Sequence, residues 1–228
     1  MEAQSSLKDT VISDSAYPVA LRDYHLYVSP EAGLYRGNQY ADYDFTVQQG
    51  QPFFGPDSIR TGSVWYSGVY YAHVHLLYDE VKQQVVIQDP FRIYKIALWM
   101  DFVDSFELDG RYLARIFDTL APSYLRTGYY EKLYQGRIVL LKRERKYLRE
   151  NLVLTSDGVR NYIDSSVSYY LKRDGAYHGF NNKREVYDLL KDRRADLRKL
   201  IRKNKLSWRR DREQILVTAV SWYDGVNH

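Results

Sequence analysis

The sequence contains no cysteine among its 228 residues. This absence excludes disulfide bonds, thiolate nucleophiles and zinc sites that depend on cysteine. It is compatible with the cytosol and equally with a cell-envelope protein that avoids thiols. Long apolar runs are missing too: no stretch of about 18 apolar residues occurs, so we expect no helix that crosses a bilayer.

Sequence signatures of phosphate and dinucleotide binding are also missing. Neither GxGxxG nor GxxxxGK followed by Ser or Thr occurs in the chain. The serine-nucleophile motif Ser5-x-x-Lys8 is matched at the chain terminus, but its companion motifs are absent. We therefore predict no catalytic residue and no cofactor, and an enzyme is less favoured than a binding protein.

Tyrosine is abundant, with 23 residues against 8 phenylalanines and 4 tryptophans. Tyrosine fits the half-buried surface of a strand, and its hydroxyl requires water or a partner, so we expect many of these rings at a sheet face or rim. The densest cluster predicts either a surface that stacks on sugar or peptide, or cross-strand pairs that stabilise the sheet. It comprises Tyr35, Tyr40, Tyr43, Tyr66, Tyr70 and Tyr71, of which Tyr35, Tyr40, Tyr66 and Tyr71 are candidate binding residues.

Residues 30–180 carry the signals of an antiparallel β meander. Asp109-Gly110 and Asp174-Gly175 separate extended runs, which is typical of a type I′ hairpin turn. A spacing Tyr-x-Gly-x-x-Tyr occurs at 35–40 and 66–71, and its first half recurs at Tyr134-x-Gly136. We interpret these as strand corners at which glycine takes a positive φ. Residues 151–166 are expected to form a loop or a short helix.

The tail has a helical period and a strong positive charge. Val186, Leu189, Leu190, Leu197, Leu200 and Ile201 are spaced for one amphipathic helix, Asn181 or Asn182 can cap it, and a second helix is expected from Asp211 to about Asp224. Lys183 to Glu213 contains thirteen Lys or Arg and six Asp or Glu, a net charge of +7, so the rest of the +4 chain is near −3.

Two interpretations of this basic tail remain open. The helices either pack on the sheet through their Leu/Ile stripe with solvated charges, or contact phosphates of nucleic acid or of an anionic lipid. The aromatic residues do not interleave with the basic run, which weakens a model of base stacking on single strands. The candidate contact residues are Arg194, Arg198, Arg202 and Lys203.

Two sets of residues are candidates for metal binding or acid–base chemistry. His73 and His75 are two apart, so on a regular strand they share a face and form a weak metal candidate that lacks a third ligand. Carboxylates among the expected strands could pair for glycoside hydrolysis in an aromatic cleft, with Asp79 and Glu80 as the pair to test. Carboxylates at turns and strand edges are also ordinary structural features.

These patterns predict an α+β fold. Residues 1–29 are an N-terminal segment, residues 30–180 form a Tyr-rich antiparallel sheet or partial barrel, and residues 181–228 form basic amphipathic helices packed on the same domain.

Three segments carry a resemblance to a known group of proteins. Gly62–Val81, Gly128–Gly136 and Arg198–Trp208 occur in an order that resembles uncharacterised secreted or cell-envelope proteins of Bacteroidetes, and the likeness extends over most of residues 34–223. The resemblance implies a removed signal peptide and residence in the periplasm or at the outer membrane. It implies no activity and assigns no functional residue. The pair Ala3-Gln4 is also similar to the residues around a signal-peptidase cut.

We therefore expect a non-catalytic envelope protein that contacts a protein partner at the outer membrane, with contact to a membrane surface as a further possibility. The alternatives are a glycan-acting hydrolase with paired carboxylates and a nucleic-acid binder that uses the basic tail, the latter being disfavoured. Cytoplasmic residence is the alternative location.

Overall fold

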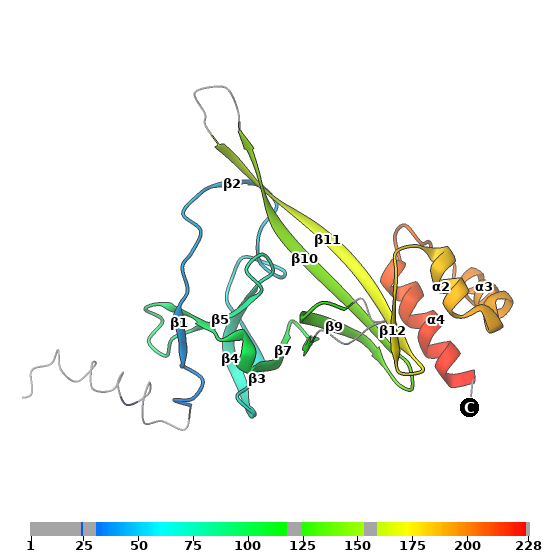
Figure 1. Cartoon of the computed structure of the whole chain (residues 1–228), viewed down its shortest axis with the longest axis horizontal. Helices are drawn as coiled ribbons and strands as arrows, with labels where there is room; N and C mark the ends of the chain where they lie inside the picture. Colours follow the sequence, from blue (N-terminus) through cyan, green and yellow to red (C-terminus); the bar gives the residue numbers. More distant parts are fainter. Residues whose placement is uncertain (1–23, 25–30, 118–124, 153–158, 227–228) are drawn as a thin grey trace, which may run out of the picture.

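The computed structural model describes residues 24, 31–117, 125–152 and 159–226. Apart from Tyr24, the N-terminal segment 1–29 lies outside the described residues. Within them, twelve strands form one open sheet, and three α-helices follow at its C-terminal end (Figure 1). The predicted α+β class is therefore confirmed, with an open sheet and not a closed barrel. No helix in the described ranges is both long and apolar enough to span a bilayer.

Most neighbouring strands in the sheet are antiparallel and consecutive along the chain. The strand order is β1-β6-β5-β4-β3-β7-β8-β9-β10-β11-β12, and β2 adds in parallel to β11. Three pairings join strands that are not consecutive: β1 with β6, β2 with β11, and β3 with β7. The chain reaches β7 from β6 through the 3-10 turn η1 (Met100–Phe102). The strands are β1 (Gly37–Gln39), β2 (Val47–Gln49), β3 (Arg60–Tyr66), β4 (Val69–Asp79), β5 (Gln84–Gln88), β6 (Lys95–Leu98), β7 (Val103–Leu108), β8 (Arg111–Ile116), β9 (Gly128–Gln135), β10 (Val139–Leu152), β11 (Val159–Arg173) and β12 (Ala176–Phe180).

The Asp-Gly hairpins are confirmed. Asp109 and Gly110 have φ values of 54° and 70°, and Asp174 and Gly175 have 51° and 81°. Positive φ at both central positions is the conformation that a type I′ turn requires. Each pair joins the two strands that the sequence predicted on either side of it.

Only one of the three predicted Tyr-Gly corners is a turn of this kind. Ser67 and Gly68 have φ values of 53° and 76° and connect β3 to β4. Gly37 instead begins β1, where a Cβ atom would collide with the backbone oxygen of Ala97, and its φ is not positive. Gly136 likewise has no positive φ, and a side chain there would collide with Asp224. These two glycines permit close approach, so the corner prediction was wrong for them.

The longest feature is the hairpin of β10 and β11, which runs diagonally from the helices to a distant tip (Figure 1). Its register pairs Val139 with Lys172 at one end and Leu152 with Val159 at the other. The expectation of a loop or short helix was therefore wrong for residues 151–152, which belong to β10, and for residues 159–166, which belong to β11. Residues 153–158 lie outside the described ranges.

The tail forms three helices, α2 (Lys183–Leu189), α3 (Arg194–Lys203) and α4 (Arg212–Val226). Of the two predicted caps, Asn181 and Asn182, the cap is Asn182, whose side chain accepts hydrogen bonds from the backbone N–H groups of Arg184 and Glu185. The single helix expected over 186–201 is broken at Leu190 and the 3-10 turn η2 (Lys191–Arg193). The break lets both α2 and α3 place apolar residues in one core.

Two large hydrophobic cores form at the two ends of the sheet. The sheet core lies among β3–β8 and includes Val64, Leu76, Phe106 and Leu108. The helical core joins β9–β12 to α2–α4; its members include Leu140, Leu171, Leu190, Leu197 and Leu216. The basic helices pack on the sheet through Val186, Leu190, Leu197 and Ile201, whereas Leu189 and Leu200 of the predicted stripe are half-buried.

Candidate functional site

Part of strand β4 forms an open edge of the sheet. β4 pairs with β5 only over Leu76–Asp79, whereas residues 69–75 have β3 as their only strand partner within the described residues. A pocket of about 590 Å³ lies along this edge, between β4 and the segments around residues 31–35 and 88–92. Backbone groups at such an edge are free to pair with an added strand.

Four predicted candidates meet in this edge pocket: Tyr35, Tyr71, His73 and His75. The two histidines do not follow a regular strand, because His73 has a φ of 55° and residues 72 and 73 of β4 together face Ser63 of β3. This bulge removes the simple alternation on which their shared face was predicted.

The surroundings of His75 do not favour a metal ion. Its Nδ1 lies 3.5 Å from the Thr61 hydroxyl, and its Nε2 lies 3.5 Å from a guanidinium nitrogen of Arg92. A guanidinium beside one ring nitrogen repels a second cation there. The described ranges also contain no group of three or more His, Cys, Asp or Glu residues that could hold a metal.

Polar groups fix the shape of the edge pocket. The Asp89 carboxylate accepts hydrogen bonds from the backbone N–H groups of Phe91 (3.0 Å) and Tyr94 (2.8 Å), which holds the 89–94 loop. Burial, and then the nearby Glu31, raises the pKa of Tyr35 to about 12. Tyr35 therefore keeps its proton at neutral pH and remains a hydrogen-bond donor.

Large apolar side chains are exposed beside this edge and form what we call the aromatic patch. Trp65 and Tyr70 face each other across β3 and β4 with ring centroids 5.6 Å apart. Trp99 and Phe102 lie 5.9 Å apart, and the Ser67 N–H donates to the Phe102 carbonyl, which brings the β3–β4 turn against η1. The aromatic patch consists of Trp65, Val69, Tyr70, Trp99, Met100 and Phe102, which are 37–52 % exposed.

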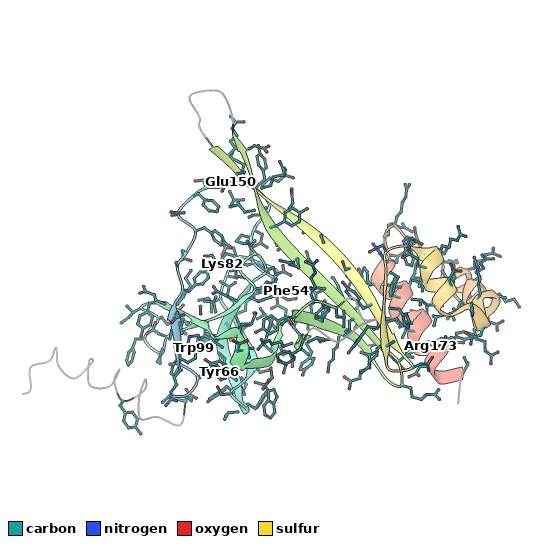
Figure 2. The ribbon with its side chains drawn as sticks, in the orientation of Figure 1. Phe54, Tyr66, Lys82, Trp99, Glu150 and Arg173 are labelled. Carbon is teal, nitrogen blue, oxygen red and sulfur yellow. The ribbon has the colours of Figure 1, made fainter. Side chains whose placement is uncertain are left out.

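Two candidate tyrosines lie inside the protein. Tyr66, labelled in Figure 2, is 1 % exposed. Its hydroxyl donates to the Arg36 carbonyl over 2.6 Å. Tyr40 is 5 % exposed and its hydroxyl donates to Asp79 over 2.8 Å; burial and this carboxylate raise its pKa well above the usual value. Both rings therefore stabilise the core, and neither is placed to contact a ligand.

The carboxylates Asp79 and Glu80 are also occupied internally. Asp79 is fully buried and accepts hydrogen bonds from Tyr40, from Tyr43 and from the backbone N–H groups of Val81 and Lys82. Glu80 is 2 % exposed, with its carboxylate 3.0 Å from the ammonium of Lys146 on β10. Burial raises the pKa of Glu80, against the hydrogen bond and the charge of Lys146. Asp79 and Glu80, the carboxylate pair of the hydrolase alternative, are therefore not placed to act on a glycan.

The basic candidates lie at the other end of the molecule. Arg194, Arg198 and Arg202 line a pocket of about 400 Å³ between α2 and α3. Lys203 is exposed in the last turn of α3 and does not line this pocket.

Sequence reasoning missed the aromatic patch and Arg92. Trp99 and Phe102 are far from Trp65 in the sequence, and the pairing of β7 with β3 places η1 beside the β3–β4 turn. Arg92 has a φ of 57° in the loop before β6, a position that no sequence motif marked. In the sequence, the aromatic residues at 65–71 around Gly68 were the signal that indicated part of the aromatic patch.

Comparison with known proteins returns no relative: no protein-family description, no curated protein and no solved structure matches this chain.

Proposed function

We propose that this protein is a non-catalytic binding protein of the cell envelope, in the periplasm or at the outer membrane, that holds a protein partner at the open edge of β4. The observation that carries the proposal is the gathering of exposed apolar side chains beside that edge. Six of the twelve large hydrophobic residues exposed on the described surface belong to the aromatic patch. Concentrated apolar surface of this kind marks interaction sites, whereas scattered single residues do not.

The edge provides a specific way to bind a polypeptide. An extended segment of the partner adds to β4 over residues 69–75, where main-chain hydrogen bonds supply affinity. Alternate side chains of that segment then face the edge pocket, where Tyr35, Tyr71 and Arg92 provide aromatic and donor groups. Trp65 and Tyr70 supply the large rigid rings that dominate the energetics of many interfaces.

The envelope location rests on the resemblance of three segments to secreted proteins of Bacteroidetes and fits the absence of cysteine. Fractionation of native cells tests it directly. Recovery of the protein with periplasmic or outer-membrane markers is expected, and recovery with cytosolic markers would contradict it.

Site-specific photocrosslinking in native cells tests the partner. A photoreactive phenylalanine analogue in place of Tyr70 is expected to give one discrete protein adduct. The same analogue in place of Tyr147, an equally exposed tyrosine on β10, serves as the matched control and is expected to give none. The change Trp65→Ala is expected to abolish the adduct at position 70. The protein is still expected to unfold in one cooperative thermal transition, because the half-exposed ring contributes about 1 kcal/mol through its cross-strand pair with Tyr70. Equal adducts at both positions, or an adduct that survives Trp65→Ala, would sink the proposal.

A further inference from the structure

A second concave site lies between α2 and α3, far from the aromatic patch, and the proposed function leaves it unused. Its wall is formed by cations from both helices, which we call the basic pocket. The basic pocket has a volume of about 400 Å³ and is lined by Lys183, Arg184, Tyr187, Arg194, Arg198, Ile201 and Arg202.

The three arginines of α3 share one side of the helix. Arg194, Arg198 and Arg202 are four residues apart, a spacing that stacks side chains about 6 Å apart along the axis. Like charges at this spacing destabilise a helix by a few tenths of a kcal/mol per pair. An anion bound among the three side chains relieves this small repulsion.

The basic pocket contains an excess of positive charge that internal ion pairs do not offset. Asp188 is the carboxylate at its edge, 3.3 Å from Arg194 and 3.9 Å from Arg184. Among the described residues, no carboxylate lies within ion-pair distance of Lys183, Arg198 or Arg202. Three cations are thus available to an external anion.

A buried ring holds these cations together. Tyr187 is 5 % exposed, and the charged groups of Lys183, Arg194 and Arg198 lie 5.6, 5.9 and 5.6 Å from its ring centroid. Attraction of a cation to an aromatic ring orders a long side chain before any ligand arrives. The helices beneath are fixed by Leu197 and Ile201, which are 0 % and 5 % exposed in the helical core.

We infer that the basic pocket binds a phosphoryl group, carried by a small phosphorylated compound or by a lipid headgroup. Guanidinium groups present paired N–H donors that match phosphate oxygens, and a dianionic phosphate offsets two of the three available charges. The concave shape and limited volume fit one compact headgroup better than the extended row of phosphates along a nucleic acid. The site shares no residue with the aromatic patch, so this inference stands without the proposed function.

Calorimetric titration of the whole chain with inorganic phosphate at constant ionic strength, balanced with chloride, tests the inference. Saturable one-site binding is expected. The double change Arg198→Ala and Arg202→Ala is expected to weaken it about tenfold or more, because two charge-assisted contacts are lost. Both residues are exposed, so the Leu/Ile stripe and the fold are retained.

The double change Arg209→Ala and Arg210→Ala is the matched control. It removes the same charge from the exposed turn before α4, outside the basic pocket, and is expected to leave the phosphate affinity within about twofold. Equal weakening by the two double variants would show diffuse attraction to basic surface and overturn the inference. Absence of saturable heat with phosphate would overturn it as well.

Vesicles distinguish the two sources of the phosphoryl group. Binding to phosphatidic acid vesicles that is stronger than to phosphatidylserine vesicles of equal charge, and that inorganic phosphate displaces, assigns a lipid headgroup. Phosphate binding without vesicle binding assigns a small phosphorylated compound. Binding to a single-stranded oligonucleotide that is far tighter than to phosphate, and that both double variants weaken alike, would replace the inferred ligand with a polyanion.

Discussion

The sheet is covered by different elements at the two ends of this molecule. At one end, the aromatic and aliphatic side chains of β3–β8 pack with one another and with Leu34 and Phe54 of the segment before β3, and no described helix contributes to the sheet core. At the other end, β9–β12 rely on α2–α4 to complete the helical core. Figure 2 shows the separation, with Tyr66 and Trp99 at the first end and Arg173 at the second. The end with the sheet core leaves apolar rings exposed. The end with the helical core exposes the Lys and Arg side chains that lie opposite the buried apolar side of the helices.

The side chains that each end exposes at its candidate site depend on how that end covers the sheet. Helices that bury Leu and Ile on one side must present their remaining residues to water, and here those residues are Lys and Arg. The turn at Ser67-Gly68 leaves the neighbouring ends of β3 and β4 exposed to solvent, and these strand ends carry Trp65 and Tyr70. A common link, the Lys146–Glu80 ion pair, ties the long hairpin to the β4–β5 turn.

Breaking that link is expected to have the largest effect. Lys146→Met leaves Glu80 buried without its cation and also removes the hydrogen bond that Lys146 donates to the Phe53 carbonyl over 2.5 Å. The expected loss in unfolding free energy is about 3 to 5 kcal/mol, measured by urea denaturation at pH 7. Adding Glu80→Gln is expected to restore part of it.

A surface pair provides the control for this change. Arg149 and Asp164 form an ion pair across the same hairpin at 2.6 Å, but their side chains are 46 % and 37 % exposed. Arg149→Ala is therefore expected to leave the unfolding free energy almost unchanged, because solvent screens the pair. A similar cost for both variants would show that the buried pair contributes nothing special to joining the two ends.

A cavity in the helical core tests whether the two ends unfold separately. Leu197 is fully buried in α3, so Leu197→Ala is expected to cost about 2 to 5 kcal/mol. Because the two large cores share no residue, hydrogen exchange is expected to accelerate in α2–α4 while β3, β4 and β7 keep their protection. Equal acceleration in both parts would instead show one cooperative unit.

The smallest expected effect concerns pH, and its sign differs between the two ends. Burial raises the native pKa of Glu80 above 4.5 despite Lys146, so above pH 4.5 the native state binds more protons and stability falls as pH rises through that raised value. Burial alone would raise the pKa of Glu213 too, but the hydrogen bond and charge of Lys142 lower it. Its contribution is present above pH 4.5 and is lost as pH falls through the lowered value.

The matching variants are expected to change the pH profile in opposite directions. Glu80→Gln removes the fall in stability just above pH 4.5, and Glu213→Gln removes the fall below it. Urea denaturation between pH 3 and 7 measures both, and the Glu213 effect is expected to be slight because its side chain is 42 % exposed. Shifts of the same sign would contradict either the dominance of burial at Glu80 or the dominance of Lys142 and its hydrogen bond at Glu213.

Local signals in the sequence predicted local structure well. The Asp-Gly turns, the Asn182 cap and the start of the last helix near Asp211 depend on neighbouring residues, and the structure confirms them. Long-range contacts were not predictable in this way. Gly37 resembles a turn glycine until β6 is placed against it, and residues 159–166 resemble a loop until β10 supplies their partner.

The same distinction between local signals and long-range contacts applies to the candidate sites. Arg194, Arg198 and Arg202 were identified because the positive charge of the tail is visible in one continuous segment of the sequence. Asp79 and Glu80 were misjudged because their partners, Tyr40, Tyr43 and Lys146, lie between 36 and 66 residues away. The helix break at Leu190 was missed because tertiary packing, and not a Gly or Pro, ends α2 there.

The bulge at His73 bears on how this protein avoids association with copies of itself. A flat, regular edge of seven residues would be a template for continuous pairing with the same edge of another molecule. The left-handed backbone at His73 interrupts the row of main-chain groups in the middle of that edge. Two short stretches of edge then remain open on either side of the bulge. This disfavours continuous edge-to-edge pairing between copies of the protein, whereas a single segment whose backbone fits the bulge can still pair with β4.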